Sequence, residues 1–181
     1  KESVYDREYY HMVLLCKNET GYKNLIKMVS LSFTEGFYTR PRIDKELLKE
    51  HSEGLIALSA CLAGEIPKAV LSGDFDRAKT IIKEYKELFD EFYLEIQDHG
   101  IEEQKLTNPQ IIRIAREIGV PLVATNDVHY VEHDDYKAHK VLLCVQTGSK
   151  ITEDNALEFK TNEFYLKSGE QMAEIFKSVP E

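Results

Sequence analysis

Apolar residues in this chain alternate between short runs and helical spacings. Short runs rich in β-branched and aromatic residues predict strands at 11–15, 55–59, 92–96 and 122–125, with a shorter one at 164–166. Ser168 with Gln171 predicts the capping box of a last helix. Between the strands, three helical faces are formed by Phe75, Ala78, Ile82, Tyr85 and Phe89, by Ile111, Ile112, Ala115 and Ile118, and by Ala138, Val141, Leu142 and Val145. This alternation predicts an α/β fold with parallel strands covered by helices, either an open sheet or a barrel.

Two polar residues follow the fourth predicted strand, in the run VATNDVHY. Asp127 and His129 are separated by one residue, and in an extended chain positions i and i+2 point to the same face. In parallel α/β folds, ligands gather at the carboxyl ends of the strands. A carboxylate and an imidazole at such an end suit zinc, manganese or iron. The alternative is that Asp127 caps a loop and His129 lies on the surface.

Four further residues lie near strand ends. Cys61 follows the second predicted strand and is either a thiolate ligand or a small buried residue. Glu95 and His99 lie near the end of the third strand, where we expect them to contact the ligands or a substrate. His11 begins its apolar run rather than ending it, so its position alone favours a structural role. Cys16 and Cys144 lie within apolar patterns and are assigned to packing, and His133 and His139 are assigned to solvated positions. His51 is expected to end a charged helix and has no chemical role.

Composition narrows the function classes. The 181 residues carry a net charge of -9, which argues against a surface that grips duplex DNA by itself. Three widely spaced cysteines favour a reducing compartment, and the sequence has no signal peptide or membrane span. Phosphate-binding glycine loops, G-x-S-x-G, H-x-H, H-E-x-x-H and C-x-x-C are all missing. Because the chain opens with Lys1 and a polar stretch, we expect it to be a piece with a segment missing upstream.

Several long motifs occur in one order along the chain. They are HMVLLCKNETGYKNL from His11, EGLIALSACLAGE from Glu53, FYLEIQDHG from Phe92, ATNDVHY from Ala124, LLCVQTG from Leu142 and EFYLKS from Glu163. Together they resemble the N-terminal PHP (polymerase and histidinol phosphatase) domain of bacterial DNA polymerase III alpha subunits. The resemblance covers essentially all of the chain. It implies that residues 1–181 form the C-terminal two-thirds or so of a distorted (β/α)7 barrel, with the first strands absent.

The resemblance also implies a metal site. The family's ligands follow the order His-x-His, Asp, His, Glu, His, Cys, Asp-x-His. By motif, His11, Cys61, Asp127 and His129 fall on the last four positions, and Asp127 and His129 are also the expected catalytic residues. The earlier ligands have no counterpart in this chain. The resemblance therefore reverses the positional interpretation of His11.

Three functions follow as expectations from the resemblance. The first is a metal-dependent 3'-5' exonuclease or phosphoesterase site, holding zinc, manganese or iron, within a replicative polymerase whose palm domain, outside this chain, holds magnesium. The second is a non-catalytic structural and docking domain with a vestigial metal site. The third, a free-standing phosphatase, is disfavoured by the motifs around Gly21 and Glu163. Expected partners are DNA through the parent polymerase, a sliding clamp and an exonuclease subunit, with no membrane and a bacterial cytoplasmic location; the isolated chain should be inactive.

Overall fold

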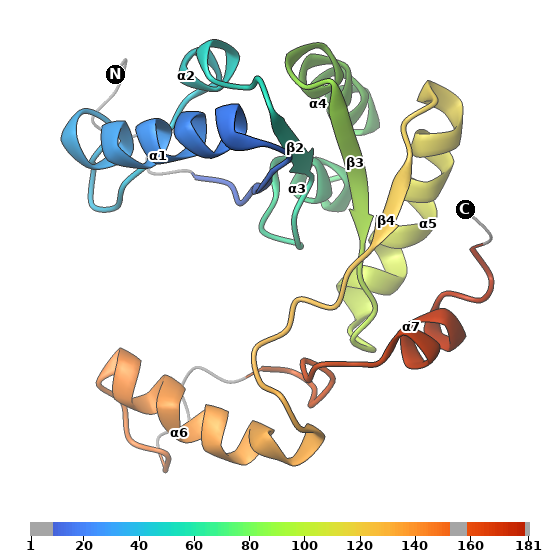
Figure 1. Cartoon of the computed structure of the whole chain (residues 1–181). Helices are drawn as coiled ribbons and strands as arrows, with labels where there is room; N and C mark the ends of the chain where they lie inside the picture. The colour runs from blue at the N-terminus through green and yellow to red at the C-terminus, as the bar shows by residue number, and fades with distance from the viewer. Residues whose placement is uncertain (1–8, 153–158, 180–181) are drawn as a thin grey trace.

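The computed structural model describes residues 9–152 and 159–179, which form a sheet flanked by helices (Figure 1). Four strands pair in the order β1-β2-β3-β4. Their bounds are β1 Val13–Cys16, β2 Leu55–Leu58, β3 Glu91–Ile96 and β4 Leu122–Ala124. These agree with four of the predicted strands to within a few residues.

Strand direction differs from the sequence prediction at one edge. β2, β3 and β4 are parallel, as expected, with Leu58 opposite Tyr93 and Ile96 opposite Ala124. β1 instead runs antiparallel to β2, with Val13 opposite Leu58 and Cys16 opposite Leu55. The prediction of parallel pairing throughout was therefore wrong for β1. Apolar content alone does not set the direction of an edge strand, because both ladders accept the same side chains.

The fifth predicted strand, at 164–166, does not form. Its place is taken by an isolated parallel bridge between Tyr130 and Tyr165, supported by the bond from the Leu166 amide to the Tyr130 carbonyl (3.1 Å). Among the described residues the sheet is open, and these residues do not close a barrel. The observed class is mixed α/β.

The helices include two that the sequence pattern did not predict, α1 Glu19–Thr34 and α3 Glu65–Leu71. α2 Lys45–Glu50 matches the charged helix expected to end at His51. The others are α4 Phe75–Leu88, α5 Glu102–Ile118, α6 Tyr136–Thr147 and α7 Gly169–Ile175. A short 3-10 turn, His133–Asp135, leads into α6. The capping box predicted at Ser168 and Gln171 is confirmed, since each side chain bonds the other residue's backbone amide.

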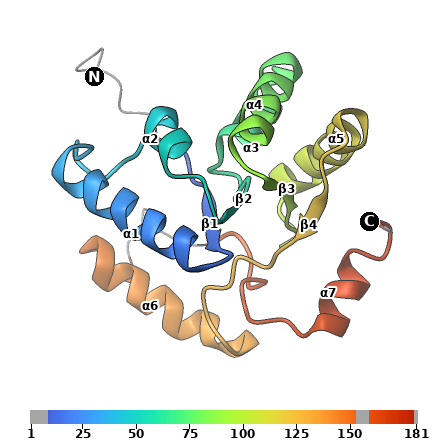
Figure 2. The same cartoon turned by 45° about the horizontal axis from the view of Figure 1, so that its top comes forward.

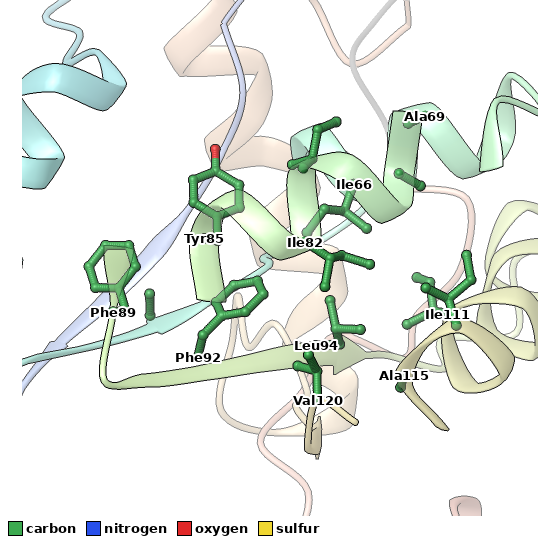
Figure 3. Packing of buried hydrophobic residues seen from close by; sticks show 14 of the residues in the cluster. Ile66, Ala69, Ile82, Tyr85, Phe89, Phe92, Leu94, Ile111, Ala115 and Val120 are labelled. Atoms are coloured by element: carbon green, nitrogen blue, oxygen red, sulfur yellow. The ribbon is translucent and has the colours of Figure 1, made fainter. Parts of the chain in front are cut away.

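The core lies between the sheet and the helices α3, α4 and α5, which gather along β2, β3 and β4 (Figure 2). Ile82 of α4 and Leu94 of β3 are completely buried and face each other in this layer (Figure 3). Ile111 and Ala115 of α5 belong to the same core cluster, as their helical spacing predicted. This packing fixes the strands whose carboxyl ends carry the candidate site.

The predicted apolar face of α6 is not a core face. Val141, Leu142 and Val145 are exposed, while Leu143 and Cys144 are buried. α6 lies away from the sheet (Figure 1), and His139, on the same helix, packs its ring against Tyr130 and Phe159. Among residues 9–152 and 159–179, no helix combines the length and the apolar character that crossing a membrane requires.

Candidate metal centre

The direction of β1 brings His11 to the carboxyl end of β2. Because β1 is antiparallel to its neighbour, the residues before β1 lie beside the residues after β2. The His11 amide donates to the Ala63 carbonyl (3.1 Å), and His11 Nδ1 lies 3.8 Å from Cys61 Sγ. The positional argument against His11 assumed parallel pairing and therefore fails. An imidazole and a thiol side by side at this edge form a nitrogen and sulfur donor pair suited to zinc.

Cys61 is held in a tight turn after β2. Ala60 has a left-handed backbone (φ 62°), a conformation unusual for a residue with a side chain. The Gly64 amide closes the turn on the Cys61 carbonyl (2.8 Å), and a Cβ at Gly64 would lie 2.2 Å from the Ser59 carbonyl oxygen. Only glycine fits there. Burial is the main cause that raises the pKa of the Cys61 thiol, and the Asp127 and Glu95 carboxylates raise it further.

Asp127 and His129 do not lie on an extended strand. β4 ends at Ala124, and Asp127 has a left-handed backbone (φ 44°), so the argument that both side chains share one face of a strand was wrong. His129 Nδ1 donates to the Asp127 backbone carbonyl (2.6 Å). That bond fixes the tautomer that leaves Nε2 as an acceptor, as in many histidine metal ligands.

The ring of His129 lies among aromatic side chains. Its centroid is 4.7 Å from that of Phe159, 5.6 Å from that of Phe164 and 5.7 Å from that of His139. His139 is thus half-buried rather than solvated as predicted, and burial lowers its pKa. In the described part of the chain, no three acidic, histidine or cysteine side chains converge closely enough to hold a metal ion. The four-residue ligand set remains a prediction, of which the structure pairs His11 with Cys61.

Glu95 occupies the centre of a buried polar network. Its amide donates to Ser59 Oγ (2.8 Å), and its Oε1 accepts bonds from Gln97 Nε2 (3.0 Å) and Thr125 Oγ1. These residues come from the ends of β2, β3 and β4, where the sequence placed Glu95. The network ties the three carboxyl ends together.

His99 is fully buried between β3 and the segment that carries Asp127. Gln104 Nε2 donates to its Nδ1 (2.8 Å), and its Nε2 donates to the Asn126 carbonyl (2.9 Å). The ring stacks on Phe164 with centroids 4.0 Å apart. His99 therefore positions the residue before Asp127, and its expected contact with the ligands or a substrate stays a prediction. Gln104 and Phe164 were not singled out from the sequence, because nothing in their local pattern marks them.

Among the residues predicted to lie outside the site, some predictions are confirmed and one is wrong. Cys144 is buried, as expected for a packing residue, whereas Cys16 is exposed because β1 is the sheet edge. His133 is solvated as predicted, with its side chain 53% exposed. His51 is the C-terminal cap residue of α2 and takes no part in the site.

Comparisons with known proteins point to one family. The family model described as "PHP domain" matches residues 2–99, more than half of the chain. The chain is 50% identical over 173 residues to the DNA polymerase III subunit alpha of Borreliella burgdorferi, 48% over 182 residues to that of Treponema pallidum, and 44% over 180 residues to that of Thermus aquaticus.

These alignments cover 94% to 99% of the chain but only 15% to 16% of each relative. The chain thus corresponds to a small part of those much longer proteins. The matched residues include His11 and Cys61, the pair that β1 and β2 bring together. On the extent of the family match, the chain belongs to the PHP domain family.

Proposed function

We propose that this chain contributes to a divalent-metal phosphoesterase site within a replicative DNA polymerase of the polymerase III alpha type. The observation that carries the proposal is the placement of His11 beside Cys61, with Sγ 3.8 Å from Nδ1, at the carboxyl end of the sheet. The reaction class is hydrolysis of a phosphodiester, and in this setting 3'-5' exonuclease activity on DNA.

The donor set fits a divalent ion. Thiolate, imidazole and carboxylate donors suit zinc, manganese or iron, whereas magnesium belongs with the polymerase chemistry of another domain. Bound metal would supply a water of lowered pKa and a Lewis acid for the phosphodiester. The protein's own part is to hold Cys61 through the Gly64 turn and to hold Asp127 through the left-handed backbone that His99 supports. Left-handed residues gather at such sites because the surrounding structure holds them against local strain.

The acidic charge of the chain bears on its substrate. At a net charge of -9, the chain would approach DNA only through bound metal or through other parts of the protein. We therefore assign DNA binding to other parts of the parent polymerase. The contacts with the sliding clamp and with the exonuclease subunit are assigned there as well.

A second candidate is a scaffold without catalysis. Two observations favour it: the His129 ring packs against Phe159 and Phe164, and no three ligands converge in the described residues. In that case the buried network at Glu95 would stabilise the domain and the metal site would be vestigial.

An exonuclease assay on the full-length protein separates the two. We compare wild type with Asp127→Ala and, as a control, Asp134→Ala, whose side chain is 83% exposed. The phosphoesterase proposal expects metal-dependent release of 3' nucleotides that falls by about 100-fold or more in Asp127→Ala, since ligand-sphere changes of this kind cost at least 10–100-fold. Polymerisation should persist in both variants. Unchanged degradation and metal content in Asp127→Ala would refute the role of Asp127, and a wild type without metal or nuclease activity would favour the scaffold.

A further inference from the structure

Two oxygens in the buried network at the strand ends have no hydrogen-bond partner among the described residues. One is Glu95 Oε2, although Glu95 Oε1 accepts two bonds. The other is Gln97 Oε1, whose amide nitrogen donates to Glu95 and Thr125. Both side chains are 95% buried, with relative exposures of 5%. A buried carboxylate oxygen without a donor is costly, so it needs a physical explanation.

These two residues share a pocket with Cys61. The pocket also takes in Ala60, Pro67 and Gln104, and it has room for roughly one water molecule. The Glu95 carboxylate is close enough to act electrostatically on the Cys61 thiol, as is that of Asp127. Glu95 and Gln97 therefore lie beside one candidate ligand, Cys61, rather than in a separate part of the core.

We propose that Glu95 is an additional cation-binding residue of the candidate metal centre, with Gln97 supplying a neighbouring oxygen. This inference rests on the proposed function, because the cation is the one that Cys61 would hold. Two adjacent acceptors without donors fit either a metal ion or the protons of its bound water. No basic side chain and no hydroxyl group of the described residues donates a hydrogen bond to Glu95 Oε2 or Gln97 Oε1.

The charge of Glu95 supports a binding role over a packing role. Glutamine has the same shape, and its oxygen would accept the bonds from Gln97 and Thr125 that Glu95 Oε1 accepts now. A purely structural position would therefore lose nothing when the negative charge is removed. Only a cation or a proton donor at Oε2 makes use of that charge.

The test is metal protection of Cys61 from alkylation in the full-length protein. Zn²⁺ is titrated at buffered free concentrations, the protein is pulsed with iodoacetamide, and the Cys61 peptide is quantified by mass spectrometry. Following that peptide alone excludes Cys16, which is exposed, and metal bound to other domains. Wild type is compared with Glu95→Gln and with Glu117→Gln. Glu117 is the control because it lies in the last turn of α5, where it pairs with Lys79 of α4. The pocket residue Gln104 lies in the first turn of α5, at the other end of the helix.

The expected result is that Glu95→Gln raises the Zn²⁺ concentration for half-protection by about 10-fold or more, the usual cost of losing a supporting group. Glu117→Gln should leave it unchanged. The unfolding free energy of metal-free Glu95→Gln should equal or exceed that of wild type, because an unpartnered buried charge is removed. A purely structural residue would give the same free energy, but its substitution would leave the Zn²⁺ concentration for half-protection unchanged.

The outcomes separate this inference from the proposed function. If wild type is not protected at any Zn²⁺ concentration, both fail. If wild type is protected and Glu95→Gln behaves like wild type, only the assignment of Glu95 fails. If Glu95→Gln does not fold, Gln97→Met is the deciding variant. Weaker protection of Cys61 by Zn²⁺ in Gln97→Met would support cation binding by the Glu95 and Gln97 oxygens, and unchanged protection would overturn it.

Discussion

His99 Nε2 lies 2.9 Å from the backbone carbonyl oxygen of Asn126, so a buried histidine on one side of the site holds the residue that precedes Asp127 on the other. Gln104 Oε1 accepts a hydrogen bond from the His99 backbone amide, and Gln104 Nε2 donates one to His99 Nδ1. The second bond fixes the neutral ring in one tautomer. Phe164 stacks on the same ring and bonds through its carbonyl to the amide of His129 (2.9 Å). Three separate segments thus meet at His99.

Removal of this side chain should weaken the protein. His99→Ala deletes two hydrogen bonds and a buried ring, so we expect the free energy of unfolding to fall by about 2–4 kcal/mol. Urea denaturation measures the loss, and hydrogen exchange should show faster exchange at the His129 amide. His133→Ala, at a solvated position, should change stability by less than about 0.5 kcal/mol. Equal effects of the two substitutions would contradict the role of His99.

His99 should also make stability depend on pH. Burial, the largest cause, lowers the His99 pKa from its usual 6.5, although the Asn126 bond and the Asp127 charge oppose the shift. Because the folded pKa is the lower one, the contribution of His99 is complete above pH 6.5. It is lost as the pH falls from 6.5 toward the folded pKa.

Urea titrations of wild type and His99→Asn at pH 7.5 and 5.5 measure this contribution. The stability advantage of wild type over the variant should shrink at pH 5.5, because the variant has no imidazole to protonate. Carboxylates titrate alike in both proteins and cancel in the difference. An advantage that stays constant or grows at pH 5.5 would show that His99 is not held neutral.

The turn after β2 should not accept a side chain. In Gly64→Ala the new Cβ would meet the Ser59 carbonyl oxygen at 2.2 Å, and relief requires moving the turn that carries Cys61. We expect a loss of about 2–4 kcal/mol in unfolding free energy, the range for overpacking a tight site. Gly169→Ala is the matched control, because its Cβ meets nothing within 4 Å; it should be neutral or stabilise by up to about 1 kcal/mol. Thermal melts compare the two, and a tolerated Gly64→Ala would refute the close approach.

The sequence patterns predicted the sheet better than the site. Short apolar runs located β1 to β4, since a strand in a covered sheet needs apolar residues on both faces. The same patterns could not predict the direction of β1, and that direction decides whether His11 reaches Cys61. Pairing direction depends on contacts between segments far apart in the chain, which no local period encodes.

Local spacing also failed beyond β4. The i, i+2 argument for Asp127 and His129 requires an extended chain, but the backbone turns left-handed at Asp127. The supporting residues Gln104 and Phe164 act through single long-range contacts, so no periodic signal points to them. By contrast, the places of Cys61, Glu95 and His99 at the strand ends were predicted correctly, because each follows or ends an apolar strand.

The edge of the sheet should promote self-association of this chain. In the described residues β1 pairs on one side only, and its Val13 and Leu15 side chains are 38% and 49% exposed. Unpaired edges recruit further strands. Light scattering over a concentration series should show mass above that of a monomer, reduced by Leu15→Lys but not by Leu106→Lys on α5. A wild-type monomer at high concentration would contradict this.

A shared cation at His11, Cys61 and Asp127 is tested most directly by zinc K-edge X-ray absorption on the zinc-loaded full-length protein. We predict a Zn–S distance of about 2.3 Å together with lighter nitrogen and oxygen neighbours. Cys61→Ser should abolish the sulfur scattering, and Asp127→Ala should lower the zinc content. A spectrum without sulfur, or one whose sulfur scattering survives in Cys61→Ser, would contradict the metal centre proposed for this PHP domain.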